Sequence, residues 1–418
     1  MHREPLIMVC TCEIAGRVRG KGFPASALKS RLLKGVGWVP TNTMISCFGP
    51  IYATPFGTTD DLMLVPDPAT EVNVDFGDGS PAEHFFLGDI RHLDGTPWSC
   101  CPRDFLRRGL DALKAEAGVD LVSAFEHEFV YTGVEEMPGA AYSLDAFRRQ
   151  GIFAEALIAG LRSAGTEPDS FMPEYGARQY EITVDPADGI AAADRAVILR
   201  EITRATAHRL GHRASFAPIL DPTGVGNGVH IHFSFCDAAN KPVMHDPADP
   251  LGLSPAARHF AAGILHHQAA LCALTAPTTV SYIRLRPNRW APTHATLETQ
   301  DRAAALRICP TLPGAEIARQ FNVEYRVADA AASPYIALAA IVWAGVDGIT
   351  RQRALPTEGP ALPATIEEAL NALQASPEAR IWMGETFHNA YLMHKRGEAA
   401  SMTGLTEAEQ CARYAATY

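Results

Sequence analysis

The segment Val229–Phe235 alternates strictly between apolar and polar residues. His230, His232 and Ser234 occupy every second position, and Val, Ile and Phe fill the others. Side chains on a strand point to opposite faces with a period of two. The segment is therefore predicted to be a strand that packs one apolar face on a core and presents imidazoles and a hydroxyl on the other face.

Other segments alternate in the same way and carry charged residues on one face. They are 125–129 with Glu126 and Glu128, 179–184 with Glu181, 322–327 with Glu324 and Arg326, and 282–286 with Arg284 and Arg286. If these strands are neighbours, their carboxylates and imidazoles gather on one sheet face and form a metal site. A solvated face on each strand is the alternative, but such faces usually carry Thr, Lys and Ser.

The donors expected on this face are mostly carboxylates, and the sequence places no thiolate with them. Such a donor set favours Mg²⁺ or Mn²⁺ over Zn²⁺. Residues two apart on a strand are separated by roughly 6–7 Å. Glu126 and Glu128 are therefore expected to serve two different ions, and Mg²⁺ sites of this kind typically hold a nucleotide phosphate.

Size and charge exclude several classes of protein. The 418 residues suggest two domains. With 36 basic and 47 acidic side chains the formal net charge is −11, so no nucleic-acid partner is expected. The longest apolar stretch, 335–345, is too short to cross a bilayer, and the charged N-terminal segment does not read as a signal peptide. The nine cysteines are scattered. We therefore expect a cytoplasmic protein with reduced thiols and no membrane partner.

The two parts of the chain have different patterns. Residues 1–100 are rich in Gly, Pro and Thr and contain short apolar runs, which predict short strands joined by long loops. Helical periodicity begins at Pro102, which suits a first helical position. Helices are expected over 102–118 and 191–210, after Ser333, and through the last sixty residues. The predicted domains are 1–100 and 101–418.

Taken in chain order, these motifs resemble the glutamine synthetases over most of the chain. The resemblance implies an α+β protein with a small N-terminal β-grasp domain and a larger catalytic domain, whose curved antiparallel sheet forms a half-barrel backed by helices. The motifs that carry it are Leu64-Val65-Pro66-Asp67, Phe125-Glu126-His127-Glu128-Phe129, Glu174 with Gln179-Tyr180-Glu181, Gly226-Asn227-Gly228-Val229-His230-Ile231-His232, Ser281-Tyr282-Ile283-Arg284-Leu285 with Arg302 and Arg307, and Glu324-Tyr325-Arg326.

The resemblance also implies roles for single residues. ATP and two or three Mg²⁺ or Mn²⁺ ions are the expected cofactors, and His232 and Ser234 would contact the nucleotide. The implied metal ligands are Glu128, Glu174 and Glu181 for one ion and Glu126, His230 and Glu324 for another. Arg302, Arg307 and Arg326 would surround the transferring phosphoryl group, and the substrate pocket would be lined by Glu128, Gly226, Arg284, Trp290 and Arg326.

The implied chemistry joins glutamate to an amine in two steps. The γ-carboxylate attacks the terminal phosphate of ATP, and an amine then attacks the resulting acyl phosphate. In the family the site lies between subunits of stacked rings. A ring assembly, expected to be a dodecamer, is therefore implied.

The sequence departs from the family where ammonium would bind. The family's Asp-Gly-Ser-Ser stretch has no counterpart, because 38–59 contains no Asp or Glu and Asp78-Gly79-Ser80 lies downstream. The family's flap Glu, six residues after the substrate arginine, is replaced by Trp290. We therefore expect a γ-glutamyl-amine ligase that uses a small amine larger than ammonia. Ordinary glutamine synthetase and a non-catalytic relative are the alternatives, and Trp290 alternatively only packs the flap against a neighbouring strand.

Overall fold

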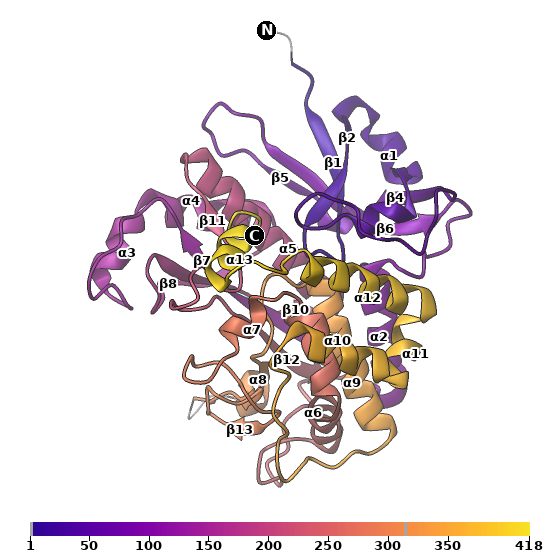
Figure 1. The fold of residues 1–418 in the computed structure, drawn as a ribbon, viewed down its shortest axis with the longest axis vertical. Helices are drawn as coiled ribbons and strands as arrows, with labels where there is room; N and C mark the ends of the chain where they lie inside the picture. The colour runs from indigo at the N-terminus through magenta and orange to yellow at the C-terminus, as the bar shows by residue number, and fades with distance from the viewer. Residues whose placement is uncertain (1–2, 313–315) are drawn as a thin grey trace.

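A computed structural model describes residues 3–312 and 316–418. The chain is an α+β protein with a smaller, β-rich N-terminal unit and a larger unit in which helices back a curved sheet, so the predicted fold class is confirmed. In Figure 1 the indigo N-terminal unit lies above the larger unit, and the yellow C-terminal helices lie between and beside them.

The N-terminal unit is a mixed sheet with strand order β2-β1-β6-β4-β3, and β5 also pairs with β6. β1 runs antiparallel to β2 and parallel to β6, and α1 (Leu28–Lys34) follows β2. The strands are β1 (Leu6–Cys12), β2 (Val18–Pro24), β3 (Val36–Trp38), β4 (Leu62–Pro66), β5 (Val72–Val74) and β6 (Glu83–His92), with short 3-10 turns at Ala25–Ala27, Pro40–Met44 and Pro68–Thr70.

The larger unit is built on a second sheet with order β13-β14-β15-β12-β7-β9-β8, in which β10 and β11 also pair with β7. β12 lies between β7 and β15, with antiparallel neighbours on both sides. The strands are β7 (Asp120–Tyr131), β8 (Pro168–Pro173), β9 (Gln179–Val184), β10 (Ala187–Asp188), β11 (Ala214–Ser215), β12 (Val229–Cys236), β13 (Leu297–Thr299), β14 (Leu306–Ile308) and β15 (Val323–Tyr325).

Helices form where the sequence predicts them. α2 (Pro102–Ala117) starts with proline and ends at Gly118, whose φ of 68° is the left-handed conformation that favours glycine. α9 (Pro334–Thr350) is the predicted buried apolar helix, and it packs on α2 and α6. The remaining helices are α3 (Leu144–Gln150), α4 (Ile152–Ser163), α5 (Gly189–Arg209), α6 (Pro255–Thr275), α7 (Ser281–Arg284), α8 (Ile317–Gln320), α10 (Ile366–Ala375), α11 (Pro377–Met383), α12 (Glu385–Ala400) and α13 (Glu407–Ala415). No helix among the described residues is long and apolar enough to span a membrane.

The prediction of a strand over 282–286 is wrong. This segment forms the short helix α7, and Thr278 and Ser281 stabilise its start through reciprocal side-chain to backbone hydrogen bonds of 3.1 and 3.2 Å. Arg284 and Arg286 therefore share no face. Arg284 is buried, whereas Arg286 is exposed and pairs with Glu407.

A buried arginine connects the two units. Arg103, on α2, is 1% exposed and donates to three carboxylates. Its distances are 2.9 Å to Asp67 and 3.1 Å to Asp89 in the N-terminal unit, and 2.7 Å to Asp194 on α5. Because a buried charge is costly without a partner, this ion cluster holds β6, α2 and α5 in one arrangement.

Candidate active site

The strand register of the larger sheet brings the predicted polar side chains together. His230 on β12 lies opposite Glu126 on β7, and His232 lies opposite Glu324 on β15. Glu128, two residues along β7, lies opposite Glu181 on β9. Four of the five segments predicted from alternation are therefore neighbouring strands, and their polar residues share one face.

Four of these side chains form a tight group around β12, which we call the histidine cluster: Glu126, His230, His232 and Glu324. His230 Nδ1 is 3.1 Å from Glu126 Oε2 and 3.3 Å from Glu324 Oε1. His232 Nε2 is 3.1 Å from Glu126 Oε1. One atom each from Glu126, His230 and Glu324 lies within 4.8 Å of the others, a spacing suited to a shared cation.

A second group of donors adjoins the first and shares His230 with it. One donor atom each from Glu128, Glu181 and His230 lies within 4.8 Å of the others. Glu128 is oriented by the backbone N–H of Gly228, which donates to its Oε2 over 2.7 Å. The Gly-x-Gly turn before β12 therefore positions a carboxylate of β7.

Glu174 does not join either group. Its Oε2 accepts hydrogen bonds from Tyr142 Oη at 3.0 Å and from the backbone N–H of Tyr175 at 2.9 Å. The negative charge of Glu174 nevertheless contributes to raising the pKa of Glu128 and of Glu181, so the carboxylate lies near them. The structure thus places this predicted metal ligand at the edge of the second group rather than within it.

The pKa values of two crowded carboxyl groups, Glu126 and Glu181, are shifted in opposite directions. Burial disfavours the charge of Glu126, but hydrogen bonds from His230 and His232 hold its pKa well below the usual range. Burial, together with the charges of Glu126 and Glu128, raises the pKa of Glu181 to about 9. A site that holds one carboxylate protonated through repulsion by its neighbours is suited to bind cations.

The predicted arginines take different positions. Arg307 donates to Glu324 Oε2 over 2.8 Å, and Arg326 also donates to Glu324. Arg302 is exposed, and its carbonyl oxygen accepts a 2.9 Å hydrogen bond from Arg326 Nε. Arg307 and Arg326 therefore contact Glu324 of the histidine cluster. Arg302 contributes only its carbonyl oxygen, which holds the Arg326 side chain.

Arg284 lies against residues 224–228, which precede β12 and which we call the glycine-rich turn. It is buried and donates to the carbonyl oxygens of Val327 and Ala328, the latter over 3.0 Å. A Cβ on Gly226 would lie 2.4 Å from Arg284 Cγ, so this position requires glycine. Gly226 and Arg284 are thus in direct contact.

Ser234 lies two residues after His232 on the same face of β12. Its hydroxyl donates to the carbonyl oxygen of Phe321 over 2.9 Å. His232 Nδ1 lies 2.9 Å from Asn322 Oδ1. The two predicted nucleotide contacts therefore lie together at the end of the polar face next to β15.

Trp290 lies on an exposed loop and not against a strand. Its side chain is 69% exposed, its φ of 52° is left-handed, and its ring lies 5.7 Å from the ring of Tyr175. Arg289 ties this loop to the glycine-rich turn by donating to Gly224 O over 2.9 Å. Since Tyr175 directly follows Glu174, the aromatic pair lies at the rim of the carboxylate groups.

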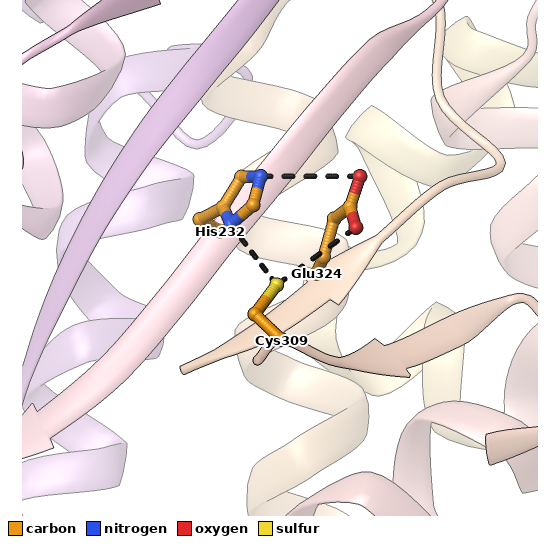
Figure 2. A group of neighbouring side chains, drawn as sticks. All are labelled: His232, Cys309 and Glu324. Carbon is orange, nitrogen blue, oxygen red and sulfur yellow. Dashed lines mark hydrogen bonds and ion pairs between the residues drawn. The ribbon is translucent and has the colours of Figure 1, made fainter. Parts of the chain in front are cut away.

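Cys309 is a site residue that the sequence analysis missed. Its Sγ is 3.7 Å from His232 Nδ1 and 3.9 Å from Glu324 Oε2, as Figure 2 shows. A cysteine sulfur therefore lies beside the carboxylates, where the sequence analysis expected none. The signal was present, because Arg307 and Cys309 are two residues apart and share a face at β14.

Comparison with protein families gives two matches that together span nearly the whole chain. The glutamine synthetase N-terminal domain matches residues 2–98, and the glutamine synthetase catalytic domain matches residues 99–414. The chain belongs to the glutamine synthetase family. Enzymes of this family are ligases that use ATP and divalent metals, and the carboxylate and imidazole donors described above fit such ions.

Individual relatives carry the names of glutamine synthetases and of gamma-glutamyl-amine synthetases. The gamma-glutamylpolyamine synthetase GlnA3 of Streptomyces coelicolor is 32% identical over 98% of this chain and 92% of the relative. The type-1 glutamine synthetase 1 of Dictyostelium discoideum is 27% identical over 97% of this chain and 88% of the relative. A solved structure described as a novel glutamine synthase homolog superposes with a TM-score of 0.96 at 42% identity, covering 100% of this chain and 99% of the other.

Proposed function

We propose that this member of the family is an ATP-dependent ligase that joins the γ-carboxylate of glutamate to an amine larger than ammonia, through a γ-glutamyl phosphate. The observation that carries the proposal is Trp290, which replaces the flap carboxylate of the family and presents an exposed aromatic face beside Tyr175. The similarity to a gamma-glutamylpolyamine synthetase supports it.

The proposed preference for an amine larger than ammonia follows from the side chains at the rim of the site, Trp290 and Tyr175. Ammonium carries a full charge and four N–H donors, and burying it without acidic partners is costly. Trp290 offers no carboxylate for that charge. An indole and a phenol instead provide an apolar surface for an alkyl or aryl group and a π face for a cation.

We assign the remaining roles as follows. Divalent ions, when bound, neutralise charge on the transferring phosphoryl group. Their proposed ligands are Glu126, Glu128, Glu174, Glu181, His230 and Glu324. Arg302, Arg307 and Arg326 stabilise the phosphoryl group and orient the γ-carboxylate, Arg284 with Gly226 holds the α-carboxylate, and His232 with Ser234 contacts the nucleotide.

A phosphate-release assay tests the proposal. The enzyme is supplied with glutamate, ATP and Mg²⁺, and kcat/KM is compared for ammonium, alkylamines, ethanolamine, polyamines and anilines. We expect at least one larger amine to exceed ammonium by tenfold or more. If ammonium is the best acceptor, the chain is a glutamine synthetase; if ATP is not turned over with any acceptor, it is a non-catalytic relative.

We also propose a division into units 1–100 and 101–418 and a ring assembly in which neighbouring chains complete each site. The separate sheets and the matches to an N-terminal and a catalytic domain support the division. The assembly is proposed from the resemblance to the family, in which the site lies between subunits of stacked rings.

A further inference from the structure

Cys309 brings a soft donor into a site otherwise composed of hard oxygen donors and imidazoles. It follows β14 directly and lies against both β12 and β15. We call Cys309, His232 and Glu324 the thiol cluster; each of them offers one donor atom within 4.8 Å of the other two. Figure 2 shows the three side chains pointing toward one another, His232 from β12, Glu324 from β15 and Cys309 from the residue after β14.

The spacing of the thiol cluster suits a tetrahedral ion. With Zn–S near 2.3 Å and Zn–N or Zn–O near 2.0–2.2 Å, ligand atoms of a tetrahedral zinc site are separated by about 3.5–3.6 Å. The observed separations from Cys309 Sγ are 3.7 Å to His232 Nδ1 and 3.9 Å to Glu324 Oε2. Both separations from Cys309 Sγ are therefore within a few tenths of an ångström of those in a tetrahedral zinc site.

A further oxygen is available for the same ion. Asn322 Oδ1 lies 2.9 Å from His232 Nδ1 and accepts a hydrogen bond from its N–H. An ion bound to Nδ1 takes the place of that proton, which passes to solvent together with the proton of the thiol. The Asn322 carbonyl oxygen, or water, then supplies the fourth ligand.

We propose that the thiol cluster binds a thiophilic divalent cation such as Zn²⁺, and that this ion excludes the Mg²⁺-nucleotide from the neighbouring site. Exclusion follows because Glu324 belongs to both the thiol cluster and the histidine cluster. A thiolate selects Zn²⁺ over Mg²⁺, which prefers oxygen ligands. The cluster would therefore make the enzyme sensitive to zinc at saturating Mg²⁺.

Cobalt reports on the thiol cluster without any turnover, so this test is independent of the proposed reaction. Co²⁺ is added to the chelator-treated full-length protein, and the near-ultraviolet charge-transfer band from thiolate to Co²⁺ is recorded. Oxygen and imidazole sites give no such band. The variants are Cys309→Ser and, as a matched control, Cys236→Ser, since Cys236 is partly exposed at the end of the same strand as His232 but lies outside the thiol cluster.

We expect the band in the wild type and in Cys236→Ser, its loss in Cys309→Ser, and its decrease when Mg²⁺ and ADP are added in excess. A wild type without the band, or a band that survives in Cys309→Ser, overturns the site. If the band depends on Cys309 but does not decrease when Mg²⁺ and ADP are added, the proposal that the bound ion excludes the Mg²⁺-nucleotide is overturned. In phosphate-release assays with Mg²⁺ in excess, the zinc concentration for half inhibition should rise at least tenfold in Cys309→Ser relative to Cys236→Ser, and equal values contradict the proposal.

Discussion

At the scale of single residues, the protonation of Glu181 makes the stability of the protein depend on pH. Its pKa of about 9 in the metal-free protein reflects burial and the carboxylates around it. The unfolded-state pKa of a glutamate is about 4.3. The unfolded chain therefore loses this proton first, so the contribution of Glu181 to stability is fully present below about pH 4 and is lost as the pH rises toward 9.

If Glu181 is a metal ligand, as we propose, metal binding displaces this proton. In weakly buffered solution at pH 7.5, we expect Mn²⁺ to release about one proton more from the wild type than from Glu181→Gln. A pH-indicator dye or calorimetry in buffers of different ionisation enthalpy measures the difference. Equal proton release by the two proteins would mean that Glu181 is already ionised before the metal binds.

Trp290 is the residue expected to distinguish amines. Replacing the indole by a carboxylate removes an apolar and π surface and adds a charge, so Trp290→Glu should lower kcat/KM for a preferred larger amine by about tenfold while reducing that for ammonium less. Trp290→Phe is the control and should retain most of the preference. Equal losses of kcat/KM for the larger amine and for ammonium in Trp290→Glu would contradict this role of Trp290.

At the scale of elements, the loop after α7 is held in place by one arginine. Because Arg289 fastens this loop to the glycine-rich turn, Arg289→Ala should raise the KM for the amine several-fold and leave the KM for ATP almost unchanged. Arg286→Ala, which removes only an exposed pair with Glu407, is the matched control. Initial-rate kinetics with each substrate varied in turn provide the measurement, and a rise in both KM values would point to a general loss of structure.

The strands show how far sequence alone leads. Alternation over 229–235 and 125–129 predicted which faces carry His230 and Glu126, because those strands are long enough for a period of two to be visible. β14 has only three residues and Cys309 lies just beyond its end, so the pattern around Cys309 was not recognised. In 282–286, two arginines two residues apart matched the alternation expected of a strand. The hydrogen bonds between Thr278 and Ser281 instead begin a helix there.

At the scale of the whole molecule, the buried ion cluster around Arg103 joins the units. Arg103→Ala leaves Asp67, Asp89 and Asp194 without their shared partner, which should cost about 3–5 kcal/mol of the free energy of unfolding. Arg148→Ala, at an exposed pair with Asp145, should cost less than about 1 kcal/mol. Urea denaturation of both variants provides the comparison, and similar losses would show that the cluster is not needed to join the units.

The proposed ring makes activity depend on assembly. Sedimentation or light scattering of the active enzyme should show a particle of at least six chains. Dilution below the concentration at which this particle persists should abolish phosphate release. A monomer with full activity would contradict a site shared between chains.

The alternation of β12 also limits how the length of this chain can change during evolution. Insertion or deletion of one residue between 229 and 235 would turn the following histidine or serine side chains into the core and bring phenylalanines onto the polar face. A change of two residues would preserve the faces but would move His232 from its place opposite Ala124 to one opposite Val122 or Glu126. Relatives that conserve the site should therefore keep the length of this strand constant and vary instead in the loops that surround it.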